Sequence, residues 1–588
     1  MCGIFGYIGN RQANDVIIQG LKKLEYRGYD STGLSVILNN EILTIKRKGD
    51  VNSLTNVSGI NRMNGKIGIG HTRWATHGVA DEINAHPHNS NDNCFSIVHN
   101  GIIENYFQLK KFAEDKGYKF VSDTDSEIIA ALLQLLYNEN MISTIEKIAK
   151  MLSGAFAIAV ISNHTPDTIY CFKNKSPMHI GIGTDEFFIS SDIYAFPKNI
   201  NSYYTLNDGD FAVIKENVKI YDSLGNLIER KNHNISYCEN SYNLNGYDHY
   251  MIKEIFEQPY VISKTLNEYS SKKSFLSNLK FENVYIIGCG SAYNAGMLGA
   301  SVLERLCNIR AKCVVSSEYK YGLNLISCND LLIVISQSGE TADTICAARN
   351  LKQRVGCKVL SIINVEKSSL EEMSDYVLYT RADKEISVAT TKCYFAQVLL
   401  LFAIANEFSS DKFILYDDID VFSKMIAVAT KLNVSMCLDK IIDSNIVFFI
   451  GKGDDYYIAL EAALKLKEVC YINAEAYPSG ELKHGSIALI DETTVVIIIC
   501  TDINYLDKNT SAVKEVASRG AYVLCIVTED CIELKKYAND VIIIPSYNNY
   551  FNKLISIVPL QLIAYHTAKK LDVNVDKPRN LAKSVTVE

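Results

Sequence analysis

Residues 284–293 read VYIIGCGSAY, and residues 447–456 read VFFIGKGDDY. Each stretch is an apolar run that ends in two closely spaced glycines, which is typical of a buried strand that turns into a helix. The two stretches are 163 residues apart, and residues 360–363 match residues 524–527 at an offset of 164. An offset that stays nearly constant over about 90 residues predicts that this half of the chain is a duplicated α/β domain.

The chain before the duplication has a different character. Short β-rich runs such as residues 168–172, 187–190 and 211–215 dominate it, and helical patterns interrupt them at residues 13–24 and 125–136. This mixture predicts a layered α+β domain. Downstream, apolar strands alternate with amphipathic helices, which predicts two α/β domains with parallel sheets.

A polar segment without either period, residues 237–246, separates the two parts. We therefore expect an α+β domain at residues 2–238, a linker at 239–248, a first α/β domain at 249–430, a second at 431–575 and a C-terminal tail at 576–588.

The composition excludes several classes of protein. The 588 residues include 59 Lys and Arg against 67 Asp and Glu, so the chain lacks the basic excess of a general nucleic-acid binder. Its apolar runs are far shorter than the roughly 20 residues of a membrane helix, and no basic segment leads into an apolar stretch at the start. The sixteen cysteines include no Cys-x-x-Cys pair, which argues against zinc. We expect a cytoplasmic protein that uses no metal and no cofactor.

Cys2 differs from the other cysteines because removal of Met1 would make it the first residue. An N-terminal cysteine carries its own base, since an α-amine titrates near pH 8 and can accept the thiol proton. The alternative is an ordinary buried cysteine near the chain end, and Cys2 alone does not decide between the two.

Three further segments bear on this question: residues 24–31 (LEYRGYDS), 71–78 (HTRWATHG) and 99–101 (HNG). Together with residues 1–6 (MCGIFG) they resemble the class II glutamine amidotransferases. The resemblance implies an N-terminal-nucleophile hydrolase fold for the first domain and glutamine hydrolysis by Cys2.

The same resemblance implies roles for the other residues of this site. Asn100 and the backbone N–H of Gly101 would form the oxyanion hole. The residues implied in glutamine binding are Arg73, Thr76, His77, His86 and Asp125, with Arg73 on the carboxylate and Asp125 on the ammonium. Trp74, the single tryptophan, would gate the passage of ammonia.

Other interpretations of these residues stay open. Asn100-Gly101 by itself is more typical of a hairpin turn, and Asp125 could cap a helix that begins at Ser126. The histidines between residues 71 and 99 are more typical of structural or substrate-contacting groups than of metal ligands.

The first repeat offers an anion site. Residues 331–335 predict a buried strand, which leads into residues 336–341 (SQSGET) and then a helix. Hydroxyl and backbone N–H groups at a helix N-terminus bind phosphate without a lysine, although a capping sequence has the same composition. The corresponding residues 500–504 of the second repeat lack the hydroxyl cluster, so we expect only the first copy to hold phosphate.

The second repeat carries groups suited to chemistry. Lys465 and Glu468 share one face of a predicted helix, and a surface ion pair between Glu461 and Lys465 is the alternative interpretation. His484 lies in a segment rich in Gly and Pro, where a histidine is less often a core residue.

The duplicated half resembles a pair of sugar isomerase (SIS) domains, on residues 336–344, 474–485 and 576–588. The resemblance implies that the chain converts D-fructose 6-phosphate and L-glutamine into D-glucosamine 6-phosphate and glutamate. Lys583 would form a Schiff base with the open-chain ketose, and Glu468, assisted by Lys465, would move a proton between C1 and C2. The implied sugar-phosphate ligands are Ser291, Ser336, Gln337, Ser338, Thr341 and Val388.

The resemblance also implies a homodimer, because His484 of this family assists ring opening across a dimer interface. Ala292 departs from the family pattern, which commonly has a hydroxyl residue there, so Ser291 would have to compensate. The chain lacks the long insertions of eukaryotic members, which argues against feedback by nucleotide sugars. Two other functions remain: a different class II amidotransferase, and a SIS-domain sensor that binds a sugar phosphate without catalysis.

Overall fold

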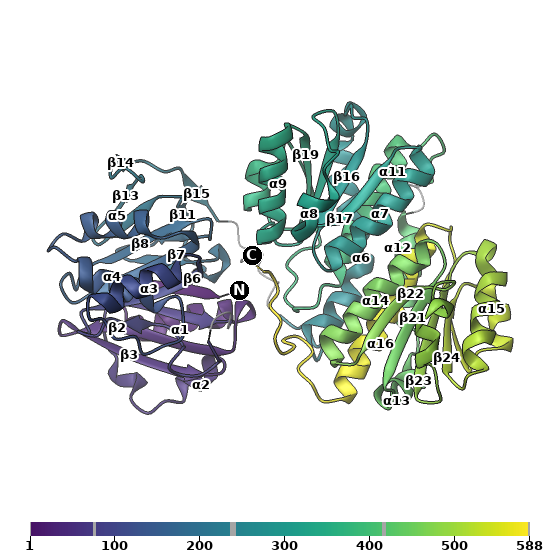
Figure 1. Ribbon diagram of the computed structural model, residues 1–588, viewed down its shortest axis with the longest axis horizontal. Coiled ribbons are helices and arrows are strands. Elements are labelled where there is room, and N and C mark those ends of the chain that lie inside the picture. Colours follow the sequence, from purple (N-terminus) through teal and green to yellow (C-terminus); the bar gives the residue numbers. More distant parts are fainter. Residues whose placement is uncertain (1, 75–77, 236–242, 414–418, 586–588) are drawn as a thin grey trace. The chain divides into compact units, whose positions relative to one another are not determined.

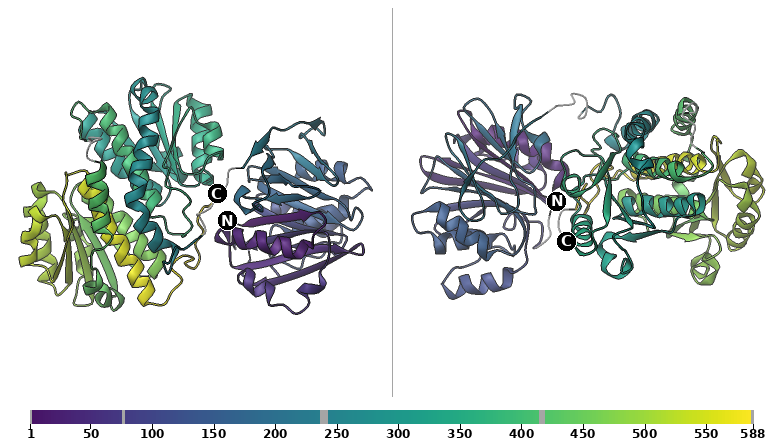
Figure 2. Two further views of the ribbon diagram at one scale, coloured as in Figure 1. Left: turned by 180° about the vertical axis from the view of Figure 1, so that it is seen from behind. Right: turned by 90° about the horizontal axis from the view of Figure 1, so that it is seen from above.

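The computed structural model describes residues 2–74, 78–235, 243–413 and 419–585. The chain divides into two compact units, Met1–Glu239 and Asn240–Lys583, with Ser584 and Val585 grouped with the first (Figures 1 and 2). The expected boundary at residues 238 and 239 lies outside the described ranges. Within those ranges, no helix has both the length and the hydropathy needed to span a bilayer.

The first unit consists of two β-sheets packed face to face, with helices on both outer faces (Figure 1). Its helices are α1 (Ala13–Leu24), α2 (Val51–Thr55), α3 (Tyr106–Asp115), α4 (Glu127–Leu136) and α5 (Met141–Met151). Its strands are β1 (Gly3–Ile8), β2 (Ser31–Leu38), β3 (Glu41–Lys48), β4 (Ile67–Arg73), β5 (His88–Asn89), β6 (Phe95–Ile103), β7 (Gly154–Ser162), β8 (Ile169–Asn174), β9 (His179–Ile182), β10 (Phe187–Ser190), β11 (Ser202–Thr205), β12 (Phe211–Ile214), β13 (Val218–Tyr221), β14 (Leu227–Ile228) and β15 (Asn232–Asn234).

The sheet order explains how this unit buries its apolar residues. One sheet runs β15-β11-β9-β10-β1-β4-β2-β3 and the other β14-β13-β12-β8-β7-β6-β5. Ile4 and Ile69 of the first sheet pack against Val98 and Ala159 of the second. α1 covers the outer face of the first sheet, and α3, α4 and α5 cover that of the second. This layered α+β arrangement confirms the expected fold class.

Two of the five helices described in this unit were expected from the sequence. The expected helix at residues 13–24 is α1, and the one expected from residue 125 begins at Glu127 as α4. α2, α3 and α5 were not expected. α5 nevertheless buries Met141, Ile145 and Ile148 along one face, a helical period that the sequence does contain.

The second unit begins with the long helix α6 (Tyr250–Ser277) and contains two copies of one α/β motif. The first copy has β16 (Val284–Gly288), α7 (Ser291–Cys307), β17 (Ala311–Val315), α8 (Tyr319–Gly322), β18 (Leu331–Ser336), α9 (Ala342–Val355), β19 (Lys358–Ile363), α10 (Ser369–Met373), β20 (Tyr376–Tyr379) and α11 (Lys392–Phe408), followed by α12 (Ile419–Ala429). The second copy has α13 (Leu438–Ile442), β21 (Ile446–Gly451), α14 (Asp454–Cys470), β22 (Ala474–Pro478), β23 (Thr494–Cys500), α15 (Leu506–Ala517), β24 (Tyr522–Val527), β25 (Asp540–Ile543) and α16 (Phe551–Lys570).

The predicted duplication is confirmed at the level of topology. The parallel sheets run β17-β16-β18-β19-β20 and β22-β21-β23-β24-β25, so corresponding strands take corresponding places. The turn into the first helix is also the same, since Gly290 has φ 56° and ψ −128° and Gly453 has φ 61° and ψ −130°. A positive φ favours glycine, which explains why both copies carry it there.

The two copies are joined by a common apolar core. α6, α7, α11 and α12 contribute to it from the first copy and α14 and α16 from the second, and α7 packs against α14 (Figure 1). Side chains at the starts of α7 and α14 can therefore meet across the duplication.

Candidate active sites

Cys2 lies directly before β1 and is held between two segments. The backbone N–H of Trp74 donates to Cys2 Sγ at 3.3 Å, and Sγ in turn lies 3.5 Å from the Trp74 carbonyl oxygen. Asn100, on β6 of the other sheet, donates from Nδ2 to the Cys2 carbonyl oxygen at 3.0 Å. The stacking of the two sheets thus brings residues 2, 74 and 100 together.

Asn100 and Gly101 do not form a hairpin turn, so that interpretation of the sequence is wrong. Both lie inside β6, opposite Ala157 and Phe156 of β7. Gly101 has φ 127°, and a Cβ there would lie 1.9 Å from the Ala155 carbonyl oxygen. The glycine is required because the neighbouring strand leaves no room for a side chain.

Buried histidines fix the orientation of the Asn100 amide. His71 Nε2 lies 3.0 Å from both the Asn100 Oδ1 and the His99 carbonyl oxygen, and since both are acceptors, Nε2 carries the proton. His86 stacks on His71 with ring centroids 4.1 Å apart. Burial lowers the pKa of His71 to about 3 and that of His86 well below its usual value, so both rings are neutral. The amide therefore keeps Nδ2 directed toward residue 2.

The two charged residues expected on glutamine are both buried. The Arg73 guanidinium donates to the carbonyl oxygens of Gly78 and Val79 at 3.2 Å. Asp125 Oδ2 accepts the backbone N–H of Ile103 at 2.7 Å, whereas α4 is capped by no side chain. The carboxylate is thus tied to the end of β6 and does not cap the helix. Thr76 and His77, also expected on glutamine, lie outside the described residues.

A cavity of about 130 Å³ lies in the second unit, beside the loop after β18. It is lined by Cys289, Ser291, Ala292, Ile335, Ser336, Gln337, Ser338, Thr341, Val388, Thr390, Gln397, Glu468, Leu581, Ala582 and Lys583. All six residues expected on the sugar phosphate are among them, together with two of the residues expected to do chemistry. The residues that line the cavity thus come from the first repeat, the second repeat and the C-terminal tail.

Lys465 is part of a buried charge cluster, so the alternative of a surface ion pair is wrong. Its side chain is 1% exposed and that of Glu461 is 0% exposed. Lys465 Nζ lies 2.5 Å from Glu468 Oε2 and 3.4 Å from Glu461 Oε1, and it donates to Ser291 Oγ at 3.0 Å. Burial alone would lower the pKa of Lys465, but the two carboxylates outweigh it and raise that pKa.

Glu461 connects this cluster to the first repeat and was not expected as a site residue. It accepts hydrogen bonds from Ser291 Oγ and Asn294 Nδ2 of α7, both at 2.8 Å. Ser291 thereby contacts the catalytic candidates Lys465 and Glu468 through one shared network.

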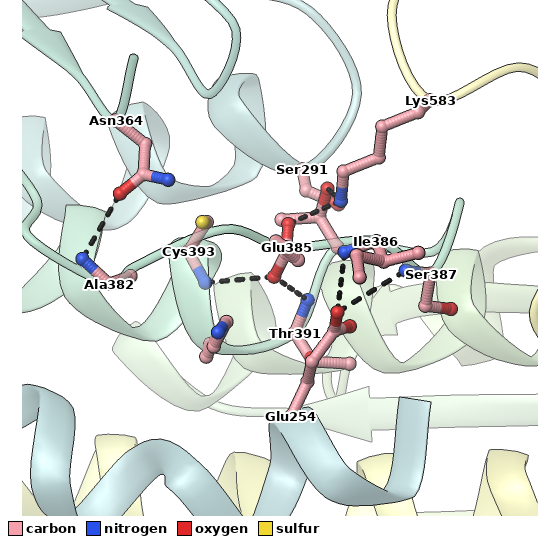
Figure 3. A network of polar contacts seen from close by, with 12 residues as sticks. Glu254, Ser291, Asn364, Ala382, Glu385, Ile386, Ser387, Thr391, Cys393 and Lys583 are labelled. Carbon is pink, nitrogen blue, oxygen red and sulfur yellow. Dashed lines mark hydrogen bonds and ion pairs between the residues drawn. The ribbon is translucent and has the colours of Figure 1, made fainter. Parts of the chain in front are cut away.

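Lys583 is fixed by a second acidic residue that sequence reasoning missed. Its ammonium donates to Glu385 (Figure 3). It also lies 3.4 Å from Thr390 Oγ1. The tail that carries it is anchored further back, where the Asp576 carboxylate accepts the backbone N–H groups of Tyr250 and Met251 at 2.8 Å each. Glu385 could have been found only by asking which acidic residue pairs with Lys583, and the sequence does not show which residue that is.

Two catalytic candidates of this unit, Lys465 and His484, are not among the residues that line the cavity, but Lys465 contacts Glu468 and Ser291, which are. His484 ends a short 3₁₀ turn, Leu482–His484, and its side chain is exposed.

In the second repeat, a buried ion pair occupies the position that corresponds to the cavity of the first repeat. Asp455 corresponds to Ala292 of the first repeat, and its carboxylate accepts the N–H of Thr501 at 3.0 Å and the Thr501 hydroxyl at 2.7 Å. Lys553 of α16 lies 2.9 Å from Asp455 and donates to Thr501 Oγ1 at 2.6 Å. A carboxylate and its ammonium partner thus lie where the first repeat has its cavity.

Comparison with known proteins agrees with this architecture. The glutamine amidotransferase domain family matches residues 71–198, and the SIS domain family matches residues 279–406 and 440–569. The glutamine–fructose-6-phosphate aminotransferases (isomerizing) of Clostridium tetani and Caldanaerobacter subterraneus subsp. tengcongensis are 40% and 41% identical over 609 residues, covering 100% of each chain. The solved C-terminal domain of glucosamine-fructose-6-phosphate aminotransferase from Francisella tularensis has a TM-score of 0.51 and 32% identity, covering 57% of this chain and 100% of that one.

The chain is therefore a glutamine amidotransferase joined to two SIS domains. Its similarity to these relatives extends over the full length of both chains. It belongs to the glutamine–fructose-6-phosphate aminotransferase (isomerizing) family.

We expect Asp455→Ala to lower the free energy of unfolding of the second unit by about 3–5 kcal/mol, because it leaves the Lys553 ammonium buried without its partner. Urea denaturation would measure the loss. Asp455→Ala combined with Lys553→Met should recover most of it, and Asp507→Ala, on an exposed part of α15, should cost little. A single variant as stable as the parent would contradict this account of the cluster.

Proposed function

We propose that this chain converts D-fructose 6-phosphate and L-glutamine into D-glucosamine 6-phosphate and L-glutamate. The observation that supports this most directly is that residues of the loop at 336–341, Glu468 and Lys583 all line the same cavity. A protein that only senses a sugar phosphate needs the loop, but it has no use for a buried amine and a carboxylate beside it. The names of the full-length relatives agree with the proposal.

In the first unit, the Cys2 thiolate attacks the amide carbon of glutamine. The oxyanion that forms is stabilised by Asn100 Nδ2 and the Gly101 N–H, and ammonia leaves as the C–N bond breaks. Water then hydrolyses the thioester to release glutamate. Arg73 and Asp125 bind the carboxylate and ammonium of the substrate, and Thr76, His77 and His86 are assigned to glutamine binding by the family resemblance. This step requires removal of Met1, so that the α-amine of Cys2 can take the thiol proton.

In the second unit, the phosphate is held by the loop at residues 336–341 together with Ser291. The Lys583 amine condenses with the C2 ketone of the open-chain sugar and releases water. Ammonia then adds at C2 and displaces the lysine, which leaves an imine of the sugar. Glu468, assisted by Lys465, moves a proton from C1 to C2, and this yields the 2-amino aldose. The remote phosphate supplies binding energy for these steps.

His484 enters the proposal as a ring-opening group supplied by a second copy of the chain. Its exposure, away from the cavity of its own chain, supports this assignment and a homodimer. The fifteen cysteines in the described ranges are all free, which supports a reducing, cytoplasmic location.

The decisive assay measures glucosamine 6-phosphate formed from glutamine and fructose 6-phosphate. Cys2→Ala should lower both glutamine hydrolysis and synthesis by a factor on the order of 10³ or more, yet leave fructose 6-phosphate binding unchanged. Lys583→Ala should abolish synthesis and preserve glutamine hydrolysis. If Cys2→Ala still hydrolysed glutamine, or Lys583→Ala still made the amino sugar, the corresponding assignment would be wrong.

We propose that Trp74 couples the two reactions, because its backbone contacts Cys2 Sγ, where ammonia is released. Trp74→Ala should keep glutamine hydrolysis and lower the amount of amino sugar formed per glutamine consumed. Trp74→Phe is the matched control and should retain more of the coupling. A Trp74→Ala variant that still forms one amino sugar per glutamine would exclude this role.

A further inference from the structure

The ion pair between Lys583 and Glu385 is almost completely buried. The side chains are 3% and 0% exposed, although Lys583 lies in the C-terminal tail and Glu385 lies 198 residues earlier. Figure 3 shows the lysine reaching from the tail to the carboxylate at the start of α11. Moving two charges out of water carries a desolvation cost that can exceed their attraction, so stability alone does not explain this pair.

Glu385 is held so that only one of its oxygens faces the lysine. Oε1 accepts the backbone N–H groups of Thr391 and Cys393, each at 3.0 Å, and Oε2 accepts from Lys583. Burial tends to raise the pKa of Glu385, but the Lys583 ammonium and the two N–H donors outweigh burial and lower it. The residue is a fixed negative charge, and for the same reason it is a poor proton acceptor.

The neighbouring titratable groups do not compete for the lysine. Glu254 on α6 accepts the N–H groups of Ile386 and Ser387, and burial together with the Glu385 charge raises the pKa of Glu254 to about 8. It is therefore largely neutral at pH 7. Lys392 of α11 is paired with Glu257 at 2.7 Å, and burial raises the pKa of the Cys393 thiol, which is thus neutral as well.

A fixed negative charge suits the proposed chemistry at this nitrogen. The Lys583 ammonium first gives up a proton, and the neutral amine adds to the ketone carbon. When a proton returns to the carbinolamine, its oxygen leaves as water, the C=N bond forms, and the positive charge lies on nitrogen as an iminium. That iminium is the electrophile to which ammonia adds, and an opposite charge close by favours the protonated form. The iminium keeps one N–H, and Glu385 Oε2 already lies where the lysine nitrogen donates.

We propose that Glu385 is the counter-ion of the protonated Schiff base formed by Lys583. This inference rests on the proposed function, and it assigns a distinct task to a residue outside the predicted site. Glu385 keeps the adduct protonated, and hence reactive toward ammonia, at neutral pH. It is a positioning and electrostatic residue rather than a proton carrier.

The test is the pH profile of adduct trapping with fructose 6-phosphate and cyanoborohydride, which reduces only protonated imines, with the modified lysine located by peptide mapping. Glu385→Gln preserves the acceptor for Thr391 and Cys393 but removes the charge. Loss of an opposite charge at this distance should shift the midpoint of trapping by about 1–3 pH units toward acid. Glutamine hydrolysis at Cys2 should not change.

Glu254→Gln is the matched control, because it removes a carboxyl group that is largely neutral at pH 7, and its midpoint should stay near that of the parent. If Glu385→Gln does not fold, Glu385→Asp carries the test: its charge lies further from Nζ, and a smaller acid shift is expected. Trapping at Lys583 with an unchanged midpoint would overturn the counter-ion but leave the Schiff base intact. Absence of any adduct at Lys583 in the parent enzyme would overturn both.

Discussion

A charge that is taken out of water must find its partner inside the protein, and this requirement shapes the second unit. Lys465, Lys583 and Lys553 are all nearly or fully buried, and each pairs with a carboxylate that is also buried. Breaking such a pair costs several kcal/mol, so each pair fixes the segments that carry it. At the cavity, the two lining residues Lys583 and Glu468 are each held by such a buried partner, Glu385 and Lys465.

These pairs also explain how separate segments form one site. The contact of Ser291 with Glu461 and Lys465 links the first repeat to the second, and Glu385 links the first repeat to the C-terminal tail. No single repeat contains a complete set of groups. The first supplies an anion loop, the second supplies Glu468, and the tail supplies the amine.

Around Asn100, the first unit avoids the cost of burying charges because the groups that it buries there are neutral. Around Asn100 it buries rings that are neutral, since burial lowers the pKa of His71 to about 3. Neutral rings can orient an amide through hydrogen bonds without adding a charge that would need a partner. The oxyanion site proposed at Asn100 is thus held by neutral groups, which suits it to a negative charge that exists only during the reaction.

The features that could be predicted from the sequence are those that depend on local residue patterns and on their order along the chain. The duplication, the fold classes and the cavity-lining residues between 336 and 341 follow from apolar periods and short motifs, and the structure brings those residues together. Glu385 and Glu461 could not be found in this way. Their partners Lys583 and Ser291 are 198 and 170 positions away, and an isolated glutamate has no local signature. The Asn100-Gly101 pair misled for a related reason, because the glycine is required by the adjacent strand rather than by a turn.

The cluster of Asp455, Thr501 and Lys553 has an evolutionary consequence. A duplicated domain begins with two equal sites, and either copy can lose or regain its ligand by single substitutions. Once a carboxylate and an ammonium were buried together in the second copy, changing either one alone became unfavourable. Reversion would need both positions to change at once, so the division of labour between the copies is held in place by epistasis.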